Sequence, residues 1–452
     1  MIALVVSRAD SASEHIGEQL LAVGDWTEHH DDSRPDADGG GAYYRTDGFS
    51  LRTFDALHIH LERPDAAFDD PDLLIVVSRH SGETGALLTA HFTGNVGDAK
   101  YGGEAGRFAR ACPNAASEAV AALDRYAPDG YEVGTECTHH GPTDVGVPSM
   151  FVELGSAEAQ WSDPAGAEAV ARAVLDLRDV APDRAKQVAG FGGGHYAPRF
   201  GRVVRETAWA VGHVAADWGL ESMGNPATNR DVLRRAVEES ATEYALVDGD
   251  REGLAGVLDD LGYRVVTETW LRETSEHPLS LVKAVETRMD AVSEGLRFGE
   301  VVPAVGSDAA EAILVTDLPA GLVDAARGVD ATATRAAVAG VSVAFETTEG
   351  GTRPSGRVAL PASESAAAAD ALTEALAAVL RESYDEVARR DGEVVARTGA
   401  FDPAAARERG VPEGPAFGRL ADGQVVEVDG ERIDPESVRT ERVERFPAAT
   451  AE

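Results

Sequence analysis

The chain has 452 residues, which is enough for two or three domains rather than one. Apolar residues make up 43% of it, so packed cores are possible and a disordered protein is excluded. The formal net charge is -37, and the only lysines are Lys100, Lys186 and Lys283, so nearly all of the 41 basic residues are arginine. Acidic residues spread along a chain that is almost without lysine indicate adaptation to high salt rather than an acidic interaction tail.

The negative charge does not decide which partners the chain binds. Phosphate groups are normally bound by basic surfaces, so such a charge would ordinarily argue against a nucleic acid partner. In molar salt, however, the Debye length falls to ~3 Å, and surface charge then says little about partners. A small cleft lined with arginine remains able to hold RNA.

Neither a disulfide framework nor a membrane segment is indicated. Cys112 and Cys137 stand in unrelated contexts and form no CxxC pattern. The apolar run that begins at Ile2 is short and leads directly into polar residues, unlike a signal peptide. No apolar run approaches the ~20 residues of a membrane span. We therefore expect a soluble, cytoplasmic protein.

Apolar runs and helical patterns alternate over the first part of the chain. Runs rich in branched apolar residues predict strands, and apolar positions three or four residues apart predict helices. The predicted strands are residues 2–7, 54–61, 73–77, 87–92, 149–154, 244–247 and 263–267. The predicted helices are one capped by Ser11, residues 115–126, 165–180 and 229–239, and a short one after residue 199. Residues 31–48, acidic and rich in glycine, are expected to form a loop.

Strands that alternate with helices predict an α/β fold with a largely parallel or mixed sheet. After about residue 300 the composition shifts towards alanine, glutamate, threonine and valine, and all 12 histidines lie before residue 278. We therefore expect the chemistry within residues 1–300. Residues 301–452 are expected to form an appended α+β domain, serving stability, dimerisation or substrate binding. The chain is expected to be either a monomer or a homodimer.

Three polar stretches, each just after an apolar run, are the best candidates for a site. They are residues 78–81, residues 136–142 and the glycine-rich residues 192–199. Loops beyond the carboxyl ends of strands meet at one edge of an α/β sheet, where sites usually lie. Taken alone, the third stretch is equally well explained as a glycine turn before a helix. The occurrence of three such stretches favours a site.

Imidazole and carboxylate groups are unusually concentrated in and near these stretches: His80, His91, Glu136, His139, His140, His195 and His213. Zinc takes three or four such ligands and leaves a position open for water in hydrolases. Water bound to zinc has a pKa near ~7 and attacks ester or amide carbonyls. No HExxH helix is present, so histidines that act only as general bases or hydrogen-bond donors are the alternative. His213 lies inside an apolar run and is at least as well explained as a core histidine.

Two other kinds of site fit the sequence poorly. Ser78 and Ser81 flank His80, but no GxSxG elbow is present, and neighbours of this kind do not make a catalytic triad. The glycines within residues 190–194 are not followed by Lys-Ser or Lys-Thr, which excludes a P-loop. A phosphate or ribose remains able to bind the N–H groups there, with Arg199 or Arg202 pairing its charge.

Four segments, taken in order along the chain, carry a family resemblance: SRHS at 78–81, LTAHFTGN at 88–95, ECTHHGP at 136–142 and GGGHYAPR at 192–199. Together with residues 2–8 and 294–299 they resemble the archaeal and plant type of D-aminoacyl-tRNA deacylase over about residues 1–300. The resemblance implies zinc dependence and a phosphorylase/hydrolase-like three-layer α/β/α sandwich with a mixed sheet. It also implies hydrolysis of the ester that joins a D-amino acid to tRNA, a step of translation quality control. Cys137 stands where the family is expected to have alanine.

On this basis the site residues are expected in three roles. The catalytic candidates are His80, Glu136, His140 and His195. The candidates for binding the D-aminoacyl-tRNA substrate are Arg79, Thr138, Gly193, Gly194, Tyr196 and Arg199. The candidate zinc ligands are His91, His139, His140 and His195, and which of them bind the metal is left open.

Two other functions are compatible with the same residues. One is another metal-dependent ester or amide hydrolase, related to carboxypeptidases or to peptidyl-tRNA hydrolases. The other is a non-catalytic tRNA-binding protein, which the density of histidines argues against. Residues 409–420 resemble a short segment of tRNA 3′-end processing endonucleases. The metal-binding histidine motif of those enzymes is absent, so no nuclease activity is implied.

Overall fold

The computed structural model of the chain describes residues 1–451, which fall into two compact units. The first unit is Met1–Ser275 and the second is Glu276–Glu452. The segment just after the boundary joins the second unit, because strand β15 (Arg297–Phe298) pairs with β17 (Ala344–Thr348). The functional division expected at residue 300 stays a prediction.

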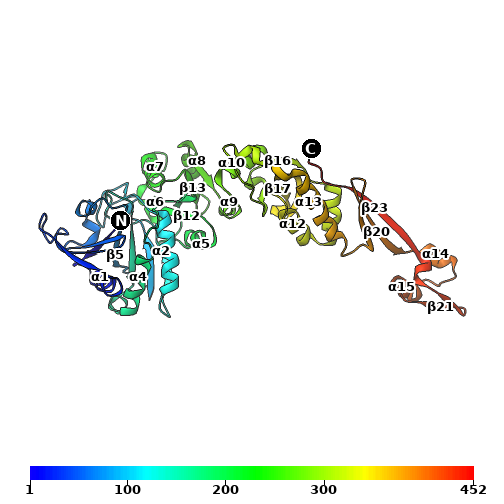
Figure 1. Cartoon of the computed structure of the whole chain (residues 1–452), viewed down its shortest axis with the longest axis horizontal. Helices are drawn as coiled ribbons and strands as arrows, with labels where there is room; N and C mark the ends of the chain where they lie inside the picture. The colour runs from blue at the N-terminus through cyan, green and yellow to red at the C-terminus, as the bar shows by residue number, and fades with distance from the viewer. Residues whose placement is uncertain (452) are drawn as a thin grey trace. The chain divides into compact units, whose positions relative to one another are not determined.

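A mixed eight-stranded sheet is the centre of the first unit (Figure 1). Its strand order is β2-β3-β4-β1-β5-β10-β6-β9. Strands β4, β1, β5 and β10 run parallel, whereas β6 is antiparallel to β10 and parallel to β9. The strands are β1 (Ile2–Ser7), β2 (Thr27–Asp31), β3 (Gly41–Thr46), β4 (Phe49–Phe54), β5 (Leu73–Arg79), β6 (Leu87–His91), β9 (Glu132–Thr135) and β10 (Ser149–Gly155).

Three helices cover one face of this sheet: α1 (Ser11–Val23), α2 (Pro113–Tyr126) and α4 (Pro164–Leu175). Their apolar stripes pack on alternate strand residues such as Leu4, Ile75 and Val152. Helix α1 is capped by the Asp10 carboxylate, which accepts from two backbone N–H groups of the first turn, rather than by Ser11. Short α3 (Glu158–Trp161) precedes α4.

The opposite face of the sheet is covered by loops. Val5, Val76 and Phe151 point to this side of the sheet. They pack against Phe68 and Val145, which lie in loops. The small ladder of β7 (Gly94–Asn95) and β8 (Arg107–Phe108) also lies in the loop region after β6. Polar side chains that point to this face therefore meet loops rather than a helical layer.

A second, fully parallel sheet completes the first unit, in the order β12-β11-β13-β14. Its strands are β11 (Gln187–Phe191), β12 (Ala210–Ala215), β13 (Tyr244–Val247) and β14 (Arg264–Val266). Its helices are α5 (Pro198–Glu206), α6 (Asp217–Met223), α7 (Arg230–Glu238), α8 (Glu252–Asp260) and α9 (Glu268–Thr274). The glycine-rich loop is the connection from β11 to α5, as the sequence predicts.

The second unit combines antiparallel sheets with helices. After α10 (Leu279–Arg288), strands β15, β17, β16 (Ile313–Asp317) and β18 (Arg353–Pro361) form one sheet. Helices α11 (Ala320–Val329), α12 (Ala331–Ala339) and α13 (Ser365–Leu380) share its core. A three-stranded sheet follows, of β19 (Glu386–Arg390), β20 (Glu393–Phe401) and β23 (Arg439–Pro447). A small cluster contains α14 (Pro403–Glu408), α15 (Pro415–Ala421), β21 (Val426–Val428) and β22 (Glu431–Ile433).

Two sequence-based predictions are wrong. The predicted strand over residues 54–61 is not formed: β4 ends at Phe54, and His58–His60 is a short 3-10 turn that buries His58. The predicted loop over residues 31–48 is wrong over Gly41–Thr46, which forms β3 and pairs with β2, whereas residues 32–40 do connect these strands as a loop. The connection turns at glycines with positive φ, Gly39 and Gly41. Within residues 1–451, no helix is both long and apolar enough to cross a membrane.

Candidate active site

A polar row crosses the centre of the eight-stranded sheet on the face away from the helices. Glu153 in β10 is the register partner of Ser78 in β5 and of Thr89 in β6. Because directly opposed residues share a face, the three side chains stand in line. The Ser78 hydroxyl donates to Glu153 at 2.7 Å, and the Thr89 hydroxyl donates to the carboxylate of Glu136 at 2.5 Å. Two buried carboxylates are thus held by hydroxyl groups on neighbouring strands.

Glu136, which follows β9, is the carboxylate on which the loops converge. Its Oε2 accepts from His195 Nε2 at 2.8 Å, and its Oε1 lies 3.1 Å from His80 Nδ1. Burial alone would raise the pKa of this fully buried carboxyl, but the hydrogen bonds from His195 and His80 outweigh burial and hold its pKa well below the usual value. Glu136 is therefore an ionised group with two imidazole partners.

His80 connects the two carboxylates. Its Nδ1 lies 3.1 Å from Glu136 and 3.6 Å from Glu153, and its Nε2 lies 3.3 Å from the hydroxyl of Tyr196. Burial by itself would lower the pKa of His80, but the hydrogen bonds to Glu136 and Glu153 raise it to about 10. At neutral pH this ring carries a proton on each nitrogen, with one of them directed at Tyr196.

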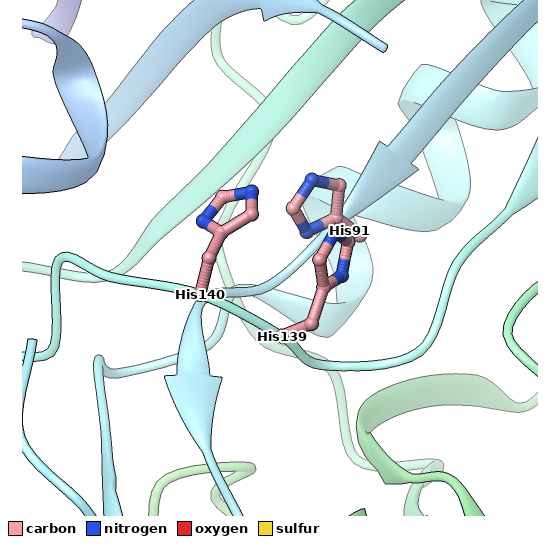
Figure 2. A group of neighbouring side chains, drawn as sticks. All are labelled: His91, His139 and His140. Atoms are coloured by element: carbon pink, nitrogen blue, oxygen red, sulfur yellow. The ribbon is translucent and has the colours of Figure 1, made fainter. Parts of the chain in front are cut away.

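Three further histidines face one another beside these carboxylates: His91 at the end of β6, and His139 and His140 on the loop after β9 (Figure 2). Each directs Nδ1 at a backbone carbonyl: His91 at Phe92, His139 at Cys137 and His140 at Gly141. The bonds are 3.2, 2.9 and 2.6 Å long. A histidine whose Nδ1–H is donated in this way presents the lone pair of Nε2, as metal-binding histidines do.

The loop geometry explains how two consecutive histidines contribute to one cluster. In an extended chain, adjacent side chains point to opposite sides. His140 instead has φ of +48°, a left-handed conformation that is uncommon for a residue with a side chain. The rings of His139 and His140 therefore lie with centroids only 4.4 Å apart. Such backbone strain is typical of functional sites.

Burial keeps two of these rings neutral. It is the main cause that lowers the pKa of His140 to about 3, with the nearby His91 adding to the effect. The pKa of His139 is lowered well below its usual value by burial and by His91 and His140. Neutral imidazole is the form that binds metals.

Three groups of side chains in the described residues have donor atoms within 4.8 Å of one another, as a metal ion requires. They are His91 with His139 and His140, Cys137 with His139 and His195, and His80 with Glu136 and Glu153. The first group fits a metal best, because its Nδ1 atoms are already bonded to carbonyls. The buried Nε2 of His91 makes no hydrogen bond and lies 3.4 Å from the carboxylate of Glu153. In the second group, both ring nitrogens of His195 have partners within the protein, Glu136 and the Cys137 thiol.

His213 lies outside the cluster and has the environment of a core histidine. Its Nε2 donates to the carbonyl of Ala109 at 2.8 Å, and its Nδ1 accepts from the hydroxyl of Thr138 at 3.0 Å. Thr138, a predicted substrate-binding residue, is itself buried and also accepts from the backbone N–H of Val214. The hydroxyl of Thr138 is thus engaged inside the protein.

Some of the remaining predicted substrate-binding residues are engaged in contacts within the protein, whereas others are exposed. Arg199 pairs with Asp248 at 2.9 Å and Glu268 at 3.2 Å, and the guanidinium of Arg79 lies 5.2 Å from the ring of Trp161. Arg202 also pairs with Glu268. Gly194, in contrast, is exposed with open space where a side chain would project, and Tyr196 is exposed beside His80. The carbonyl of Gly193 accepts a hydrogen bond from the backbone N–H of Asp217.

Comparison with known proteins identifies the family of this chain. The family model described as D-aminoacyl-tRNA deacylase matches residues 67–266. The D-aminoacyl-tRNA deacylase of Halorubrum lacusprofundi is 55% identical to this chain, covering 99% of the chain and 97% of the relative. This chain belongs to the D-aminoacyl-tRNA deacylase family. The family's member from Natronomonas pharaonis is 53% identical, covering 99% of this chain and all of that protein. Both organisms are halophilic archaea, in agreement with the predicted adaptation to salt.

One solved structure, of a conserved protein of unknown function, is also similar to this deacylase. It is 29% identical, aligns with a TM-score of 0.54, and covers 60% of this chain and 96% of that protein. The mixed α/β architecture is thereby supported by a solved relative.

The sequence analysis does not identify one member of this cluster, Glu153. The available signal is a carboxylate between Val152 and Leu154 in the otherwise apolar run that forms β10. A charged side chain is almost never fully buried unless it is paired. Glu153 is buried, and His80 and His91 hold its pKa below the usual value against the effect of burial.

Proposed function

We propose that the cluster of His80, His91, Glu136, His139, His140, Glu153 and His195 is the centre at which this chain hydrolyses the ester bond of D-aminoacyl-tRNA. The observation that carries the proposal is the orientation of three histidines, whose Nδ1 atoms are bonded to carbonyls next to two ionised, buried carboxylates. Such a constellation suits an ester, which is cleaved by an activated water with a nearby base and a proton donor.

We place zinc at His91, His139 and His140. Nitrogen ligands suit zinc, and three protein ligands leave a position open for chemistry. A zinc ion there supplies a Lewis acid that polarises an ester carbonyl and makes water more acidic. The backbone carbonyl partners of the three rings hold them in the tautomer that the metal needs.

The other side chains of the cluster handle protons. Glu136 lies within hydrogen-bond reach of His195, which fixes its orientation, and it is the general base in our proposal. His80 holds a proton on Nε2 next to Tyr196, at the exposed side of the cluster. We assign to it the transfer of that proton to the 3′ oxygen of tRNA as the ester bond breaks. Glu153 keeps His80 charged for this purpose.

Gly193, Gly194 and Tyr196 border the exposed side, and we propose that they receive the sugar to which the amino acid is attached. The absence of side chains at the two glycines lets a ligand approach the backbone closely. Discrimination between D and L substrates is then steric, because a pocket that admits one direction of the side chain excludes the mirror image.

We also propose a phosphorylase/hydrolase-like arrangement for the first unit and a cytoplasmic location, where the tRNA substrate is found. The support for the arrangement is the large mixed sheet with helices on one face. Residues 301–452 contain no histidine, so we assign the chemistry to residues 1–300 and a supporting role to the remainder.

The test is the deacylation of D-tyrosyl-tRNA and L-tyrosyl-tRNA in high salt, with and without a chelator. We expect the D form alone to be hydrolysed, the chelator to abolish the reaction, and zinc to restore it. Hydrolysis of neither substrate would contradict the proposed function. Hydrolysis that the chelator leaves unchanged would remove zinc from the mechanism and keep the deacylase.

A further inference from the structure

The exposed aromatic side chains of this protein are gathered at the histidine cluster. Among residues 1–451, the large hydrophobic side chains that are exposed are Tyr101, Tyr196, Trp218, Val302 and Val443. The three aromatic ones are 68%, 38% and 49% exposed, and all belong to the first unit. Every other phenylalanine, tyrosine and tryptophan ring in that range is buried or half-buried. Exposed rings concentrated at one place mark a binding surface.

Each of the three residues is joined directly to the loops that carry the cluster. Tyr196 follows His195 and reaches His80 with its hydroxyl. The Tyr101 carbonyl accepts from the N–H of Gly141, which is next to His140. Trp218 lies beside the thiol of Cys137, the residue between Glu136 and Thr138.

Two contacts connect these segments to one another. The N–H of Asp98 donates to Ser222 in α6 at 3.1 Å, which brings the segment of Tyr101 against the helix of Trp218. The N–H of Asp217, also in α6, donates to Gly193 at 3.0 Å, which brings the same helix against the loop of Tyr196. The segments that carry the three exposed rings are therefore neighbours at the histidine cluster.

We propose that Tyr101, Tyr196 and Trp218 form a stacking surface for the unpaired nucleotides at the 3′ end of the tRNA. The inference rests on the proposed function, which places the ester of the terminal nucleotide at the histidine cluster. Unpaired bases stack on aromatic side chains in single-strand binding proteins, without a sequence requirement. The unpaired 3′ end is common to all tRNAs, so a surface that stacks its bases suits a deacylase that acts on many of them.

The charge of the protein favours stacking over phosphate pairing. The net charge is -37, and in molar salt the attraction of phosphates to basic residues is largely screened. Arg199 and Arg202 near the site are already paired with acidic residues. Lys100, next to Tyr101, is exposed and has no ion-pair partner in the described part of the chain, so it is available to one backbone phosphate. Stacking does not depend on charge and keeps its strength in salt.

The test compares Tyr101→Ala and Trp218→Ala with Tyr101→Phe and Trp218→Phe. We expect each alanine variant to raise the KM for D-tyrosyl-tRNA about tenfold more than the KM for D-tyrosine methyl ester, which lacks nucleotides. Tenfold corresponds to ~1.4 kcal/mol. The phenylalanine variants keep a ring and should stay within about threefold of the wild type, which separates stacking from loss of structure. Tyr43→Ala is the matched control, because Tyr43 lies on β3 near the other edge of the sheet.

A KM for D-tyrosyl-tRNA that stays within twofold of the wild type in both alanine variants would overturn the proposal. A binding measurement separates this failure from a failure of the proposed function. Trp218 is the exposed tryptophan among residues 1–451, so a short single-stranded RNA ending in C-C-A should quench tryptophan fluorescence in the wild type but not in Trp218→Phe. Equal quenching by the same RNA in a blunt duplex, or no quenching at all, contradicts stacking whether or not the protein hydrolyses any ester.

Discussion

The histidine cluster and the surroundings of His213 use the same side chain in opposite ways. His91, His139 and His140 bind backbone carbonyls through Nδ1, and their rings bring ligand atoms within 4.8 Å of one another. His213 in β12 has both nitrogens satisfied, and its ring packs against the rings of Phe92 and Phe108. All four rings are largely or fully buried, so burial does not separate them. What separates them is the number of ring nitrogens that are hydrogen-bonded within the protein: both in His213, and Nδ1 alone in the other three.

The comparison shows why a count of histidines is a weak guide to a metal site. The imidazole of His213, bonded on both nitrogens to groups outside the cluster, is a structural hydrogen-bond bridge, and a change there affects stability. A buried imidazole with one partner is held ready for a ligand, and a change there affects chemistry. The four variants below test this distinction, from the largest expected effect to the smallest.

His139→Ala should lower kcat/KM for D-tyrosyl-tRNA by ~1000-fold, since the metal supplies several kcal/mol of transition-state stabilisation. The bound metal, measured by mass spectrometry of the dialysed protein, should fall in parallel. His30→Ala, in the exposed hairpin of β2 and β3, is the control and should keep both. A variant His139→Ala that retains its metal and its activity would remove this ring from the site. His80→Ala, His140→Ala and His195→Ala should likewise lose most activity.

Glu136→Gln should lower kcat by ~100-fold and leave the metal content unchanged, because it removes a general base and no proposed ligand. The substitution keeps the volume of the side chain and the acceptor oxygen for the Thr89 hydroxyl. Glu132→Gln, on the strand that precedes Glu136, is the matched control, since Glu132 is exposed. An unchanged kcat would show that another group takes the proton.

His213→Gln should change the dependence of stability on pH. Burial lowers the pKa of His213 from its ordinary 6.5 to about 3, so the unfolded chain binds a proton that the folded chain does not. The stabilisation is complete above pH 6.5 and is lost as the pH falls towards 3. Between pH 7.5 and 5, the free energy of unfolding should fall by about 2 kcal/mol more in the wild type than in His213→Gln.

Chemical denaturation in high salt at the two pH values measures this difference. His30→Gln serves as the control, because His30 is exposed and should leave the pH dependence as it is in the wild type. The same pH dependence in His213→Gln and the wild type would mean that His213 is not a neutral core histidine.

Cys137→Ala should have the smallest effect, with kcat/KM within about threefold of the wild type and the metal content unchanged. Burial raises the pKa of the Cys137 thiol to about 12, so it stays protonated at neutral pH, and the thiolate is the form that binds metals. Loss of bound metal in this variant would make the group of Cys137, His139 and His195 a metal site.

The fold follows from the sequence wherever burial is periodic or continuous. The apolar runs at residues 2–7 and 244–247 predict β1 and β13, because a buried strand is apolar over most of its length. The alternation over residues 54–61 fails as a predictor, because a turn buries His58 against Phe151 and Asp10 through contacts from distant parts of the chain. A short alternating pattern does not contain that information.

The position of the candidate site could be predicted from the sequence, but the role of each histidine could not. Polar residues after apolar strands indicate where loops converge, and the structure brings His80, Glu136, His139 and His195 together. Which nitrogen of each ring is occupied depends on carbonyl groups placed by the loop, such as that of Gly141. Backbone carbonyls leave no trace in a sequence, so the division between ligands and proton carriers was left open.

The polar row of Ser78, Glu153 and Thr89 also favours one register of β10 in the sheet. A slip of β10 by one residue would turn Glu153 to the other face, where Val170 and Val174 of α4 pack. There the carboxylate would lose its hydroxyl and imidazole partners, and burying an unpaired charge is costly. Glu153 therefore disfavours other registers of β10, so one residue of the histidine cluster also helps to fix the alignment of the strands.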